Sequence, residues 1–143
     1  MSTLGALQAT LAGEHACVFG YGLLGAYAAD DDLPDVRSAY ETHRGRREVL
    51  AFQIRIRHAE PVAALPAYAI PIEVTNPASA RQLAGLLEQR LAVLYADLVD
   101  VTSVPELREL AATTLVETAV LATRWTGDTV ALPGLDAVPE PPE

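Results

Sequence analysis

Residues 60–77, EPVAALPAYAIPIEVTNP, separate two stretches of helical sequence in this 143-residue chain. The segment carries Pro61, Pro66, Pro71 and Pro77, and no helix continues through prolines at that density. Its YAIPIEV portion has strand-like side chains, but Pro71 lies in the middle, so we expect extended chain on the surface. The fold therefore depends on what the sequence forms on either side of this connector.

Amphipathic helices are predicted on both sides of the connector. Apolar residues recur at alternating spacings of three and four, which places them on one face of a helix. The third predicted helix opens with Asn76 as N-cap and Pro77 in the first position, and the fourth opens with a Ser-x-x-Glu capping box at Ser103. The predicted helices cover residues 3–29, 34–59, 77–101 and 104–125, and the crossover covers residues 60–76.

The length of the connector favours one topology. The second predicted helix is about 39 Å long, and a fully extended connector reaches about 59 Å. The connector can therefore cross the whole bundle and start the third helix at the same end as the second. Two antiparallel pairs joined by one long crossover make an all-α, ferritin-like four-helix bundle, which we expect for residues 1–127. The alternative is an up-down-up-down bundle with a loose loop. Residues 128–143 are expected to form a proline-rich, acidic, loosely ordered tail.

Composition and charge exclude several classes of protein. Apolar residues make up 50% of the chain, which is too many for a disordered protein. The net charge of −9 disfavours nucleic acid as a partner, because an acidic surface repels phosphates. The single cysteine, Cys17, excludes an internal disulfide framework and a cysteine-based zinc site. The apolar run at residues 16–29 is too short to span a membrane and no basic segment starts the chain, so we expect a cytoplasmic protein without a membrane partner.

Polar residues interrupt the predicted inner faces at a common depth, near the middle of each helix. Glu14 lies on the inner line of the first predicted helix, and His43 and Arg47 lie on that of the second. Glu88 flanks the inner line of the third helix, and Glu117 lies on that of the fourth. Because mid-helix positions of a bundle meet in one layer, a buried carboxylate there needs an ionic partner or a metal.

A dimetal centre is one interpretation of this layer. Ferritin-like metal proteins use a Glu from each of two helices and a Glu-x-x-His motif from each of the other two. Glu14 and Glu88 suit the two single positions, but the chain contains no Glu-x-x-His, and only His43 lies at the central depth. An atypical iron or manganese site would make the protein metal-binding or a metal-dependent oxidoreductase. Its ligands would be Glu14, Glu88, Glu117 and His43.

Four segments resemble a known family. They are GEHACVFGYGLLGAY at residues 13–27, THRGRREVL at 42–50, AYAIPIEV at 67–74 and YADL at 95–98. Together they are similar to an uncharacterised, mainly actinobacterial family of ferritin-like domains of unknown function, and the similarity covers most of residues 4–126. The resemblance implies a ferritin-like four-helix fold and no assigned activity, and it includes no diagnostic catalytic motif.

The arginines favour a different interpretation, in which the layer is a buried network of salt bridges and hydrogen bonds. Arg44 and Arg47 would bring positive charge to the depth where a dimetal centre holds its cations. Arginine stays protonated and forms bidentate hydrogen bonds with carboxylates, so its charge can replace that of the metal. We therefore expect a non-catalytic scaffold or interaction module without a cofactor, rather than an enzyme. Exposure of these residues at the surface, on a wrongly assigned face, is the remaining alternative.

Self-association is expected as a twofold homodimer. Gly20, Gly22 and Gly25 on the first predicted helix allow a second backbone to approach closely. The segment AFQIRIR at residues 51–57 carries more apolar surface than one bundle face can bury. Cyclic dimers are also the commonest closed assembly of soluble proteins. The sequence alone names no other protein partner and no ligand.

Overall fold

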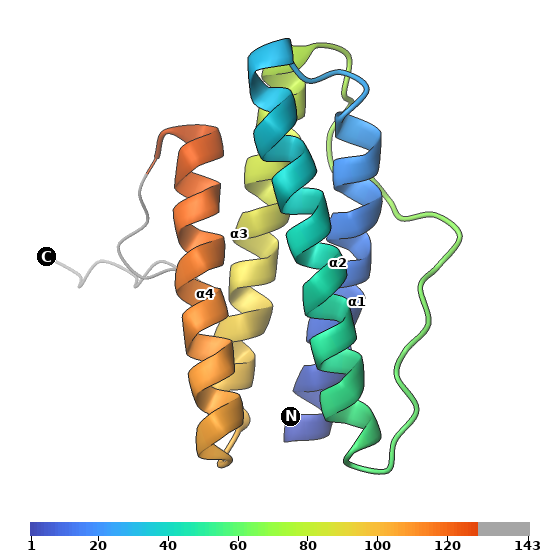
Figure 1. Ribbon diagram of the computed structural model, residues 1–143, viewed down its shortest axis with the longest axis vertical. Helices are drawn as coiled ribbons and strands as arrows, with labels where there is room; N and C mark the ends of the chain where they lie inside the picture. Colours follow the sequence, from blue (N-terminus) through green and yellow to red (C-terminus); the bar gives the residue numbers. More distant parts are fainter. Residues whose placement is uncertain (129–143) are drawn as a thin grey trace, which may run out of the picture.

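The computed structural model describes residues 1–128, which form a bundle of four α-helices (Figure 1). The elements are α1 (Thr3–Leu24), a short 3-10 helix η1 (Asp30–Asp32), α2 (Leu33–Arg55), α3 (Pro77–Val101) and α4 (Pro105–Thr126). This part of the chain contains no β-strand, so the predicted all-α four-helix class is confirmed. None of these helices combines the length and the apolar character that crossing a bilayer requires.

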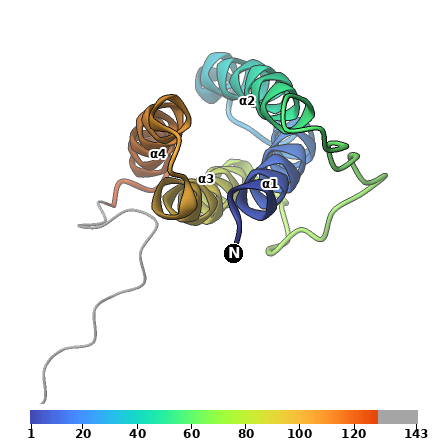
Figure 2. The ribbon, with the colours of Figure 1, turned by 90° about the horizontal axis from the view of Figure 1, so that it is seen from below.

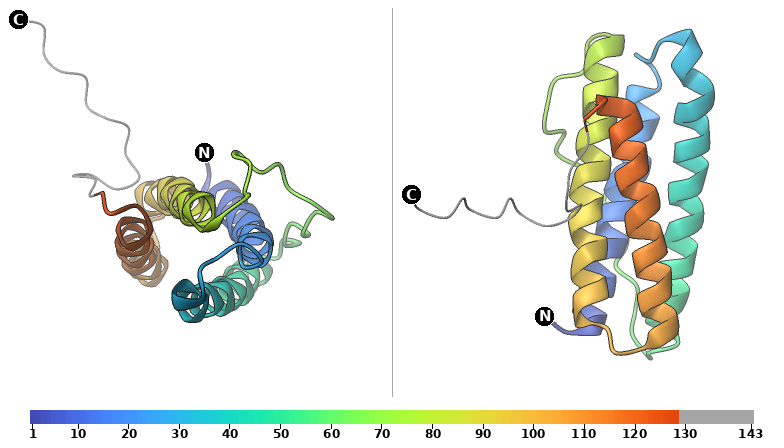
Figure 3. Two further views of the ribbon diagram at one scale, coloured as in Figure 1. Left: turned by 90° about the horizontal axis from the view of Figure 1, so that it is seen from above. Right: turned by 90° about the vertical axis from the view of Figure 1, so that its left-hand side faces the viewer.

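The helices are connected as two antiparallel pairs. In Figure 1, α1 runs upward, α2 runs downward beside it, and the green crossover then climbs the length of the bundle. α3 therefore starts at the same end as α2 and runs parallel to it, and α4 returns antiparallel to α3. Seen end-on (Figure 2), the order around the bundle is α2, α1, α3, α4, and the view from the other end agrees (Figure 3). The closest packing joins α1 to α2, α1 to α3 and α3 to α4.

Two helices end four or five residues before the predicted position. α1 ends at Leu24 rather than at residue 29, and Gly25 is its C-cap. Glycine is a weak helix former, and the chain turns here to enter η1 and α2. α2 ends at Arg55 rather than at residue 59, because His58 adopts a left-handed φ of 58° that an α-helix does not accommodate.

The helix caps bear out one sequence signal and correct another. Asn76 Oδ1 accepts a hydrogen bond from the Ser79 backbone N–H at 2.9 Å, and Ser79 Oγ accepts one from the Asn76 N–H at 3.1 Å, so a capping box opens α3. The box expected at Ser103 does not form. Val104 is the N-cap of α4 and has no side-chain cap. The reason is that Pro105 takes the first helical position, which proline favours.

The crossover, residues 56–76, covers the outer face of α1. The Gln8 side chain donates to the Glu60 carbonyl at 2.6 Å and accepts from the Val62 N–H at 2.8 Å. Further along, the rings of Phe19 and Tyr68 lie 5.7 Å apart. α1 is thus packed on both sides, which explains why its sequence is apolar on nearly every face.

Glycines on α1 bring it close to α3. A Cβ added at Gly20 would lie 2.5 Å from Leu87 Cδ1, and one added at Gly13 would collide with Leu94. The expectation that Gly20 serves a second copy of the chain is therefore wrong, because α3 occupies that position. The predicted tail at residues 128–143 lies, apart from Asp128, outside the described residues.

Candidate functional site

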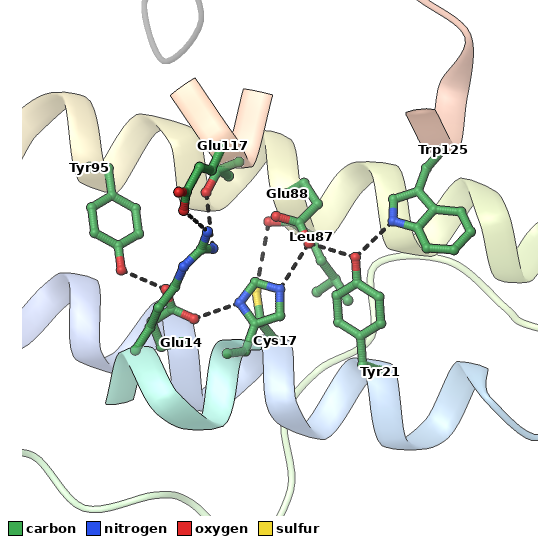
Figure 4. A network of polar contacts seen from close by, with 11 residues as sticks. Glu14, Cys17, Tyr21, Leu87, Glu88, Tyr95, Glu117 and Trp125 are labelled. Atoms are coloured by element: carbon green, nitrogen blue, oxygen red, sulfur yellow. Dashed lines mark hydrogen bonds and ion pairs between the residues drawn. The ribbon is translucent and has the colours of Figure 1, made fainter. Parts of the chain in front are cut away.

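A polar layer crosses the middle of the bundle (Figure 4). Glu14 from α1, His43 from α2 and Glu88 from α3 are each fully buried. All three lie mid-helix on inner faces that are lined mainly by leucine and alanine. The helical period of the sequence therefore places two carboxyl groups and one imidazole at one depth of the core.

His43 joins the two carboxylates. Its Nδ1 lies 2.6 Å from Glu14 Oε2, and its Nε2 lies 2.9 Å from Glu88 Oε1. Burial alone would lower the pKa of His43, but the hydrogen bonds to Glu14 and Glu88 and the charges of both raise it to about 9. His43 is therefore an imidazolium at neutral pH, and each of its ring nitrogens donates to a different helix.

Two tyrosines and a tryptophan extend the hydrogen bonding of the layer. Tyr95 donates to Glu14 Oε1 at 2.6 Å, and Tyr21 donates to Glu88 Oε1 at 2.5 Å. The indole N–H of Trp125 in turn donates to the Tyr21 hydroxyl at 2.9 Å. Burial and the neighbouring carboxylates hold the pKa values of Tyr21 and Tyr95 well above their usual range, so both hydroxyls remain protonated donors.

Arg46 supplies the second positive charge. Its side chain is only 13% exposed and reaches from α2 to α4, where it donates to Glu117 Oε2 at 2.9 Å and to Thr118 Oγ1 at 3.3 Å. Burial would lower the pKa of Arg46, but the negative charge of Glu14 leads the effects that raise it. The His43 imidazolium is thus the direct ionic partner of both buried carboxylates. Arg46, which pairs with Glu117, adds a second positive charge that interacts with the charge of Glu14.

Three of the predicted layer residues lie elsewhere. Arg44 is exposed and pairs with Glu41 at 3.1 Å, and Glu117 is 59% exposed. Arg47 is half-buried, with no hydrogen-bond partner for its Nε among residues 1–128. One residue along a helix turns the side chain by about 100°, and this explains why Arg46 and Thr118 occupy the places that the sequence suggested for Arg47 and Glu117.

Cys17 lies beside the layer but is not a candidate nucleophile. It is buried, and its Sγ lies 3.9 Å from the Leu87 carbonyl oxygen. Burial, followed by the charges of Glu88 and Glu14, raises the pKa of the Cys17 thiol well above its usual range. A thiol that stays protonated at neutral pH is a poor nucleophile and a poor metal ligand.

The layer does not suit a dimetal centre as it stands. A metal-binding imidazole must present an unprotonated nitrogen, whereas both nitrogens of His43 are held by carboxylates. Within residues 1–128, no group of three or more His, Cys, Asp or Glu side chains is arranged to hold a metal ion. One feature remains open to a ligand: Glu88 Oε2 is buried and has no hydrogen-bond partner in the described part of the chain.

A small open pocket of about 190 Å³ lies at the end of the bundle, beside Trp125. Its charged groups already pair with each other across the pocket. Arg81 contacts Asp32 at 2.8 Å, and Arg124 contacts Asp35 at 2.9 Å. The charged groups of the pocket are therefore paired, and none of them lacks an ionic partner.

Fold and site together define a four-helix bundle with a buried ionic network. The family described as "Domain of unknown function (DUF4439)" matches residues 6–137, and the chain belongs to this family. The structure is similar to the crystal structure of a conserved hypothetical protein from Mycobacterium tuberculosis, with a TM-score of 0.85 and 32% sequence identity. The match covers 87% of this chain and 95% of that one. The comparison with curated proteins finds no significant match.

Sequence reasoning missed some members of the network. Tyr21 recurs in step with the apolar residues of its helix, so the sequence pattern predicts a core position for it but no hydrogen bond. Tyr95 and Trp125 likewise carry no sign of their hydrogen bonds in the sequence. The available signal was general: a buried Tyr or Trp needs a partner for its polar atom, and buried carboxylates at the same depth could supply one.

Proposed function

We propose that this protein is a non-catalytic helical scaffold or interaction module of the ferritin-like type, in which a buried ionic network takes the place of a dimetal centre. The observation that carries this proposal is His43. Its two ring nitrogens bind carboxylates from two other helices, Glu14 at 2.6 Å and Glu88 at 2.9 Å. The imidazolium thus occupies the central position between the carboxylates.

Burial supports a structural role for the network. Glu14, His43 and Glu88 have no exposed surface, so a substrate has no access to them in this conformation. Their hydrogen bonds run to each other and to the buried hydroxyls of Tyr21 and Tyr95. Such a network fixes the rotation and register of α1, α2 and α3, because any slip leaves a charge buried without a partner.

The contribution of α4 also supports replacement of a metal centre. In the ferritin-like dimetal arrangement every helix places a carboxylate in the core. Here α4 buries Thr114 and Thr118 at the central depth, and Glu117 points to the surface. Thr118 accepts a hydrogen bond from Arg46. Because arginine is always protonated, Arg46 can supply the positive charge that a metal ion would otherwise bring.

The second candidate is a metal-binding protein, and the unpartnered Glu88 Oε2 favours it. A buried carboxylate oxygen without a donor is a ready ligand for a cation. Binding would require His43 to lose its proton and Glu117 to turn inward from the surface. Iron and manganese are the metals that a mixed carboxylate and imidazole set would hold.

Elemental analysis of untagged protein, purified without chelator, separates the two candidates. The scaffold proposal predicts much less than one iron or manganese ion per chain, before and after incubation with either metal. It also predicts no metal-dependent rise in melting temperature. Stoichiometric metal that is lost in Glu88→Gln, but kept in the surface control Glu41→Gln, would establish the metal-binding candidate instead.

A further inference from the structure

The outer face of α2 carries apolar side chains that nothing in the described chain covers. Phe52 is 58% exposed, Ile56 is 50% exposed and Val49 is 42% exposed. The crossover packs on α1 and leaves α2 at the edge of the bundle, as the end-on view shows (Figure 2). We call Gly45, Val49, Phe52 and Ile56 the α2 stripe.

The α2 stripe has the spacing of a helix-pairing seam. Its members are separated by four, three and four residues, which keeps them in line along a helix that packs against another helix. At its upper end, a Cβ placed on Gly45 would meet no atom within 4 Å, so a second backbone has room to approach there. The stripe therefore suits a helix as its occupant.

Two charged residues flank the α2 stripe on the same side. Glu48 directly precedes Val49, and Arg55 directly precedes Ile56, seven residues later. Both are exposed, and neither forms an ion pair within residues 1–128. Residues at such flanking positions set the partner and orientation of paired helices.

These charges are complementary to a second copy of the same helix. A twofold axis perpendicular to α2 brings equal flanks of two copies together and reverses the residue order. Glu48 of each copy then faces Arg55 of the other, and the two stripes interdigitate around Phe52. In a parallel pair of α2 helices, Glu48 would instead face Gln53 of the other copy. Glu48 and Arg55 would then both lack an ionic partner.

We propose that the α2 stripe is a self-association surface, on which two copies of the chain pack their α2 helices antiparallel about a twofold axis. The inference rests on the proposed role as an interaction module, and it adds that the partner is a second copy of the chain. The seam spans roughly 18 Å of helix at the rise per residue of an α-helix, so the interface is small. Small interfaces form weak complexes, and we expect a dimer that dissociates on dilution.

Sedimentation velocity of the full chain over a range of concentrations tests this surface. The wild-type protein should shift from monomer to dimer with increasing concentration, and Phe52→Glu should remain a monomer. The matched control is Val93→Glu on α3, because Val93 is exposed to nearly the same degree as Val49, at 43%, and α1 separates α3 from α2 (Figure 2). Far-UV circular dichroism confirms that each variant is folded.

Charge reversal tests the antiparallel arrangement. Glu48→Arg or Arg55→Glu alone should raise the dimer dissociation constant roughly tenfold, since each replaces two surface ion pairs with two repulsive contacts. The double reversal should restore the wild-type value. Three results would overturn the proposal: a wild-type monomer at every concentration, a dimer that is lost in Val93→Glu but kept in Phe52→Glu, or a double reversal that does not restore the dimer. The dimer dissociation constant does not depend on metal content, so this experiment can fail independently of the elemental analysis that tests the proposed function.

Discussion

Raising the pH should destabilise the folded protein by a predictable amount through His43. In the fold the pKa of His43 is about 9, whereas its ordinary value, which the unfolded chain should show, is 6.5. The folded state therefore binds the proton more tightly. The resulting stabilisation is complete below pH 6.5 and disappears as the pH rises through 9. The difference between the two pKa values corresponds to about 3 kcal/mol.

Urea denaturation at a series of pH values between 6 and 9.5 measures this effect. The reference is His43→Met, which removes the imidazolium and keeps the other titratable side chains of the layer. At pH 6 the variant should be less stable than the wild-type protein by about 3–5 kcal/mol, the usual cost of breaking a buried ion pair. By pH 9.5 that gap should narrow by about 3 kcal/mol, because the wild-type imidazolium has lost its proton.

The reasoning is refuted if the gap between the two proteins stays constant over this range. A constant gap would mean that the pKa of His43 is the same in the folded and the unfolded chain, so that the fold does not hold its proton. A gap that widens with pH would mean that the fold prefers the neutral imidazole. Either result would remove the ionic interpretation of the layer and leave His43 as a group available to a metal.

Two pairs of matched variants extend the test to the rest of the bundle. Arg46→Gln removes the second cation near Glu14 and should cost about 1–3 kcal/mol in urea denaturation. Glu117→Gln removes the exposed carboxylate that Arg46 contacts but leaves the Arg46 charge in place, so it should cost less than about 1 kcal/mol. Equal costs would contradict the assignment of Arg46 to the layer. Gly45→Ala should raise stability by about 1 kcal/mol, because it lies in an exposed helix interior. Gly20→Ala should be less favourable than Gly45→Ala, because its new methyl group displaces the buried Leu87 side chain, and a gain as large as that of Gly45→Ala would contradict the described packing of α1 on α3.

Much of the fold was predictable because it depends on local signals. Prolines at positions 61, 66, 71 and 77 forbid a helix in the crossover whatever surrounds it. The Asn76-Pro77 pair starts α3 where expected, since its capping side chain acts within one turn. The end of α1 was harder to predict. The apolar sequence continues to Ala29, and only the turn into η1 shows that the helix stops at Leu24.

The sequence predicts which residues lie in the buried layer at mid-helix depth, but not which side chains pair with them. Glu14, His43 and Glu88 interrupt inner faces, so the helical period alone assigns them to the core. Which cation meets them depends on the rotation of α2 by less than one third of a turn, and sequence periodicity does not resolve Arg46 from Arg47 to that degree. The hydrogen bonds of the two core tyrosines depend on side-chain conformation. Sequence periodicity places these rings in the core but does not predict where their hydroxyl groups point.

The protonation state of the His43 ring at pH 7.5, measured by nitrogen-15 NMR on the untagged protein, tests the central claim most directly. The ionic network predicts that both Nδ1 and Nε2 carry a proton, each donated to a carboxylate. Two protonated nitrogens whose signals stay unchanged when iron(II) or manganese(II) is added would agree with the account. An unprotonated ring nitrogen at this pH would contradict it, because the layer would then contain a neutral imidazole of the kind that binds metals.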